Sequence, residues 1–151
     1  MTATNHAIMG ALIATAVHNP WAALPLAFLS HFLLDVLPHF GPPEDMTVHT
    51  RKYWYIVGTD LVLAALLLTA LLFSGHSQAL LLTACAFAAA SPDALWAYYL
   101  YYEVIAKKPK KLSKLAAFLG AIQWAEFPGG LGVEIVWGIL TGVLLFSRVW
   151  A

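Results

Sequence analysis

The chain has 151 residues, of which 61% are hydrophobic, and its mean hydropathy is +0.75. With Gly counted and Tyr omitted, the apolar share is about 64%, against ~45–50% in ordinary soluble domains. Charged residues make up only 11%, and this low share, with the high hydrophobic content, excludes a disordered chain. The 8 basic and 8 acidic side chains cancel, which excludes an overall positive charge that would bind nucleic acid. Cys85 is the only cysteine, so an intramolecular disulfide framework is excluded as well. The sequence therefore predicts one domain, residues 1–151, built as an all-α polytopic membrane bundle.

The first part of the chain predicts a helical hairpin with arms at about residues 4–18 and 20–37. Asn19-Pro20 interrupts the apolar run, and Pro favours the first turn of a new helix. No Lys or Arg precedes His18, so the basic region of a secretory signal is missing and we expect this segment to stay attached. The first arm is shorter than the ~20 residues of a full span, which predicts that it crosses a thinned or protein-lined region.

Further along the chain, a proline-rich polar loop is expected before two apolar spans, at 53–73 and 79–103. The second span is interrupted by Ser91-Pro92-Asp93 and ends in an aromatic run typical of a membrane interface. The apolar stretch 115–146 is too long for one helix and is divided at Phe127-Pro-Gly-Gly130. The sequence therefore predicts about six helices in all, with breaks near Pro92 and Pro128.

Basic residues predict the orientation, because Lys and Arg are retained on the cytoplasmic side. Arg51 and Lys52 open the third helix, and two helices later a lysine-rich segment follows, so both fall on one face. The lysines are Lys107, Lys108, Lys110, Lys111 and Lys114. We interpret this run as an anchor for anionic lipids in preference to a patch for substrate phosphate.

Ionisable side chains inside the predicted helices are few, and each costs roughly 2.5–3.5 kcal/mol to insert. His31 and Asp35 are four residues apart, which places their Cβ atoms about 5–6 Å apart on one helix face and suits two ligands of one metal. His39 continues this spacing, but Pro38 is expected to break the helix before it.

Depth in the bilayer indicates which other residues join this pair. His6 is level with His31 across the hairpin turn. Asp60 and Asp93 lie roughly 10 and 13 Å inside the basic face, so we expect all four residues to converge toward the cytoplasmic third of the bilayer. The predicted metal ligands are His6, His31, Asp35, His39 and Asp60, with Asp93 or Glu126 as the catalytic base. In the alternative interpretation, Asp60 and Asp93 only form hydrogen bonds between helices, and Glu134 with Trp137 forms a packing contact.

The segment from Ser30 to His39 resembles the predicted membrane-bound, metal-dependent hydrolases of the YbcI/YdjM-like group of small multipass proteins. The resemblance rests on His-x3-Asp beside a Pro-His exit and on an early histidine before a Gly-Ala-rich helix, matched here by His6, His31, Asp35 and His39. Ser91-Pro92-Asp93 is similar to the Pro-Asp element of the group. The Arg-Gly-x-Thr-His-Ser stretch of many members is absent from this chain.

These observations predict a hydrolase that uses a divalent metal ion, zinc first and manganese or iron as alternatives, to cleave a lipid-linked ester or phosphate. We expect a multi-pass protein of a cell membrane, such as a prokaryotic inner membrane, with membrane lipids as partners and the site facing the cytoplasm. A homo-oligomer is left open, and no nucleic acid is expected. A small ion or metal transporter and a non-catalytic membrane assembly protein remain alternatives, so whether the chain is an enzyme is left open.

Overall fold

The computed structural model describes residues 1–108, 111 and 113–151, and these form a predominantly helical bundle. Lys110, one of the lysines of the predicted lipid anchor, lies outside the described residues. In chain order the α-helices are α1 Ala3–Ala16, α2 Pro20–Asp35, α3 Arg51–Leu72, α4 Ala79–Ala90, α5 Ala94–Leu100, α6 Lys114–Ile122 and α7 Gly130–Val149. The all-α fold class is confirmed, and six separate helices result when α4 and α5 are taken as one rod.

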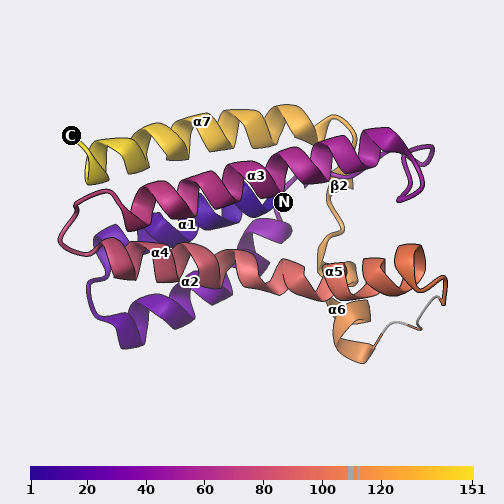
Figure 1. Cartoon of the computed structure of the whole chain (residues 1–151), viewed down its shortest axis with the longest axis horizontal. Helices are drawn as coiled ribbons and strands as arrows, with labels where there is room; N and C mark the ends of the chain where they lie inside the picture. Colours follow the sequence, from indigo (N-terminus) through magenta and orange to yellow (C-terminus); the bar gives the residue numbers. More distant parts are fainter. Residues whose placement is uncertain (109–110, 112) are drawn as a thin grey trace.

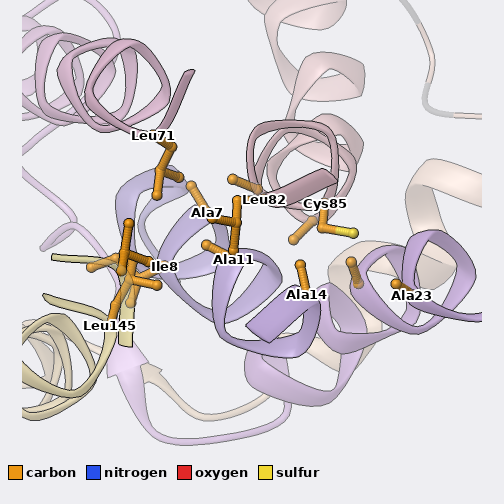
Figure 2. Packing of buried hydrophobic residues seen from close by; sticks show 13 residues of the cluster. Ala7, Ile8, Ala11, Ala14, Ala23, Leu71, Leu82, Cys85 and Leu145 are labelled. Carbon is orange, nitrogen blue, oxygen red and sulfur yellow. The ribbon is translucent and has the colours of Figure 1, made fainter. Parts of the chain in front are cut away.

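Helix α1 lies in the centre of the bundle and contacts α2, α3, α4 and α7 (Figure 1). Small side chains make up much of its buried face, and Ala7, Ala11 and Ala14 have no exposed surface. Around them pack Leu71 of α3, Leu82 and Cys85 of α4, and Leu145 of α7 (Figure 2). The first arm of the hairpin is therefore largely covered by four other helices, which agrees with the expectation of a protein-lined region.

Helices α1 and α4 approach each other closely at Gly10. A Cβ atom at this position would lie 2.2 Å from the backbone oxygen of Cys85 and 2.7 Å from Cβ of Ala89. Only glycine permits this approach, because the obstructing atom belongs to the backbone and cannot rotate away. The contact fixes α4 against α1 one helical turn from His6 along the chain.

Helices α4 and α5 form one rod of 27 residues, Ala79–Ile105, that contains two irregular turns. The predicted break at Pro92 is a 3₁₀ turn, Ser91–Asp93, and a π-helical turn, Tyr101–Ile105, ends the rod. Such turns change the direction of side chains and are frequent at functional sites. The chain near Pro128 is extended: β2, Glu126–Phe127, pairs in parallel with β1, His39–Phe40, which the sequence did not predict.

Within the described residues, three helical segments are long and apolar enough to cross a membrane: Arg51–Leu72, Ala79–Ile105 and Gly130–Val149. Their large apolar side chains are mostly exposed on the surface of the bundle, for example Leu66 on α3 and Ile139 on α7. The hairpin of α1 and α2 agrees with the prediction, with Asn19 capping α2 through a hydrogen bond from the backbone N–H of Trp21. Helix α6 has only nine residues and is too short for a span.

Candidate metal centre

Two histidines and one aspartate meet where α1, α2 and the 3₁₀ turn come together. One ring nitrogen each of His6 and His31 and one carboxylate oxygen of Asp93 lie within 4.8 Å of one another. Both imidazoles are buried, whereas the Asp93 side chain is 31% exposed. Two nitrogens and one oxygen at this separation could hold a divalent metal ion, with a fourth position left for water or substrate.

The hydrogen bond of His31 determines which of its nitrogens can bind a metal. Nδ1 lies 2.8 Å from the carbonyl oxygen of Ala89, and because a carbonyl only accepts, Nδ1 donates. The neutral ring therefore carries its lone pair on Nε2, which lies 3.2 Å from Asp35 Oδ2 and 3.8 Å from Asp93 Oδ1. A lone pair facing two carboxylates requires a proton or a cation between them.

His6 supplies an independent sign of a missing partner. Its Nε2 lies 3.1 Å from Asp35 Oδ1, whereas Nδ1 is buried without a hydrogen-bond partner. An unsatisfied buried polar atom costs roughly 1–3 kcal/mol, so such atoms are rare unless a ligand completes them. The donor set of two imidazoles and a carboxylate could therefore hold a divalent metal ion.

Asp35 is the most heavily contacted carboxylate of the centre. Its two oxygens contact both imidazoles, the α-amino group of Met1 at 2.7 Å and Nε2 of Gln123 at 3.1 Å. Ligand atoms of a tetrahedral zinc site lie about 3.3 Å apart, given metal–ligand distances near 2.0–2.1 Å. The contacts of Asp35 with the two rings, at 3.1 and 3.2 Å, are close to this spacing, so Asp35 can either bind the metal beside His31 Nε2 or orient His6 by accepting from its Nε2.

Asp60 and Glu134 occupy a neighbouring position but act on the backbone of α1. Asp60 accepts hydrogen bonds from the backbone N–H groups of Ala3 and Thr4, and Glu134 accepts one from that of Thr2. Carboxylates at a helix N-terminus satisfy its free N–H groups and interact favourably with the helix dipole. The structure thus places Asp60, predicted as a metal ligand, as an interhelical hydrogen-bond acceptor, which was the alternative interpretation of this residue.

His39 and Glu126 form a separate pair on the two short strands. His39 Nδ1 donates to the carbonyl oxygen of Leu37 at 2.6 Å, and its Nε2 lies 3.3 Å from Glu126 Oε1. Burial alone would lower the pKa of His39, but the hydrogen bonds with Glu126 and Leu37 outweigh it, and the pKa lies above its ordinary value. As Pro38 indicated, His39 leaves the helix and does not join His6 and His31.

A cavity of about 840 Å³ extends outward from the cluster. It lies between the first turns of α3 and the rod of α5, and Asp93, Gln123 and Glu126 all line it. Its wall is otherwise mainly apolar and aromatic, including Trp54 and Trp96. The site of predicted chemistry is therefore joined to a space large enough for a drug-sized or lipid-like molecule.

The structure brings four of the predicted site residues together, namely His6, His31, Asp35 and Asp93, and places Asp60 and the His39–Glu126 pair beside them. The sequence did not indicate the contacts made by Gln123 or the α-amino group of Met1. Gln123 could have been noticed, because it is a polar residue in an otherwise apolar stretch, as Glu134 is.

Comparisons with known protein families, with curated proteins and with solved structures find no match to this chain.

Proposed function

We propose that this chain is a membrane-embedded, metal-dependent hydrolase that acts on a lipid-linked ester or phosphate near the cytoplasmic leaflet. The observation that carries the proposal is the meeting of His6, His31 and Asp93, because Asp93 also lines a cavity whose wall is mainly apolar and aromatic. The resemblance to the YbcI/YdjM-like group supports it, because His6, His31 and Asp35 carry that resemblance and contact one another.

The residues divide the work of the reaction between them. His6, His31 and Asp93 would hold the metal, with zinc as the first candidate, and Asp35 would orient His6 by accepting a hydrogen bond from its Nε2. A bound divalent ion supplies a water of lowered pKa and polarises the ester or phosphoryl oxygen. Glu126, 39% exposed and facing the cavity, accepts the proton of the attacking water and shares it with His39.

Purified protein tests the proposal through metal content and hydrolysis measured on the same sample. We expect about one zinc, manganese or iron ion per chain and cleavage of a fluorogenic acyl ester or alkyl phosphate in detergent micelles. His31→Ala and Asp93→Ala should lose both, whereas His18→Ala, at an exposed histidine near the hairpin turn, should lose neither. Equal metal content in all four proteins would overturn the proposal, and ion flux into proteoliposomes without hydrolysis would favour a transporter.

A further inference from the structure

The Asp, Glu, Lys and Arg residues among the described lining of the large cavity are all acidic. Among the described lining residues, Asp60, Asp93, Glu103, Glu126 and Glu134 are carboxylic acids, and none is Lys or Arg. The α-amino group of Met1 also lies at the cavity, but it is paired with Asp35 at 2.7 Å. The lysines closest along the chain are Lys52, directly before the lining residue Tyr53, and Lys107, two residues after the lining residue Ile105, and neither is among the residues that line the cavity.

Asp60 and Glu134 accept hydrogen bonds from the backbone of α1. Asp93 belongs to the metal cluster, and Glu126 is paired with His39. Glu103 remains, on the π-helical turn Tyr101–Ile105, and it makes no hydrogen bond or ion pair within the described part of the chain. It lines the end of the cavity formed by the last turn of the rod, whereas Asp93 lies ten residues earlier on the same rod. Asp93, a candidate metal ligand, therefore lies toward one end of the cavity, and Glu103 lies toward the other, which we call the acidic end.

Aromatic residues line the cavity together with Glu103, whose side chain is exposed. Tyr53 and Trp54 come from the first turn of α3, and Tyr101 comes from the π-helical turn, where α3 and α5 diverge (Figure 1). Rings of Tyr and Trp attract ammonium groups through their faces, most strongly where water is partly excluded. A carboxylate among such rings attracts a cation and repels a phosphate group, unless the phosphate is bound to the metal.

From this arrangement we infer that the cavity binds an amphiphile with an ammonium group, held between Glu103 and the rings of Trp54 and Tyr101. The inference rests on the proposed function, because it names the substrate class of the same site. The hydrolysable ester or phosphodiester then lies toward His6, His31 and Asp93, and the apolar remainder lies along the wall between α3 and α5.

Binding of three six-carbon probes to the full chain in maltoside micelles tests the inference: hexyltrimethylammonium, hexyl phosphate and hexanol. Titration calorimetry should show the ammonium probe binding at least about tenfold more tightly than the other two. Glu103→Gln should weaken this binding about tenfold and leave hexanol unchanged, whereas Glu44→Gln, in the exposed loop before α3, should change neither. Higher salt should weaken binding of the ammonium probe and leave that of the uncharged hexanol unchanged.

Equal affinities for the three probes, or an ammonium affinity that does not respond to Glu103→Gln, would overturn the inference. Metal content and hydrolysis are measured on the same preparations, so the two proposals can fail separately. A protein that holds metal and cleaves the ester but shows no preference for the ammonium probe loses only the inference. A protein that prefers the ammonium probe but holds no metal loses only the proposed hydrolase activity.

Discussion

The imidazole rings of His6 and His31 are stacked, with centroids 3.8 Å apart and planes inclined by 24°. Two positively charged rings at this distance would repel each other strongly in a buried position. The stack is therefore compatible with at most one charged ring, and two neutral rings are the form in which histidine binds metals. The pair joins α1 to α2, so an ion bound there would stabilise the fold in addition to its role in a reaction.

Metal removal is expected to lower thermal stability. A metal present at 100 times its Kd stabilises the folded state by about 2.7 kcal/mol, so dialysis against a chelator should lower the Tm and added zinc should restore it. The His31→Ala protein should show no difference between the two conditions. His18→Ala should behave as the wild type, and a chelator effect of equal size in His31→Ala would contradict the site.

Glu134 is expected to stabilise the start of α1. Its carboxylate accepts hydrogen bonds from the backbone N–H groups of Thr2 and Phe40 and from the side chain of Asn5. Glu134→Ala leaves these donors unpaired, so we expect a loss of about 2–3 kcal/mol in unfolding free energy, measured by denaturant titration in micelles. Glu44→Gln, in the exposed loop, is the matched control. A change below about 0.5 kcal/mol in Glu134→Ala would argue against this role.

Gly10 is expected to tolerate no side chain. Gly10→Ala places a Cβ against the backbone of Cys85, so α4 must move away from α1 at a cost of about 1–3 kcal/mol. A Cβ at Gly142, on α7, meets nothing within 4 Å, so Gly142→Ala should be neutral or stabilising. Melting curves of the two variants give the comparison, and equal melting temperatures would show that the α1–α4 contact is looser than described.

The His39–Glu126 pair is expected to make stability depend on pH. Because the pKa of His39 is raised in the folded state, the pair contributes stability that is fully present below about pH 6.5, the value of free histidine. This contribution is lost as the pH rises through the raised pKa of folded His39. Wild-type Tm should therefore fall more between pH 6 and 8 than that of Glu126→Gln, and parallel curves would contradict the prediction.

Several parts of the fold could be predicted from local sequence alone. Asn19-Pro20 marks the hairpin because Pro20 fits the first turn of α2 and Asn19 caps it. Ser91-Pro92-Asp93 marks the irregular turn for a similar local reason. The β1–β2 pairing could not be predicted, because His39 and Glu126 are far apart in the sequence and each strand has only two residues.

The sequence by itself determined the helical class, the three apolar spans and the short set of ionisable residues, since periodicity, length and charge are local properties of the chain. It also indicated the pairing of His31 with Asp35, because one helical turn separates them. Only the tertiary structure decided which of the other acids join that pair. Asp93 reaches the two histidines, whereas Asp60 and Glu134 bind the backbone of α1. The physical reason is that the free N–H groups of a central helix require acceptors, and their position is fixed only once the helices pack.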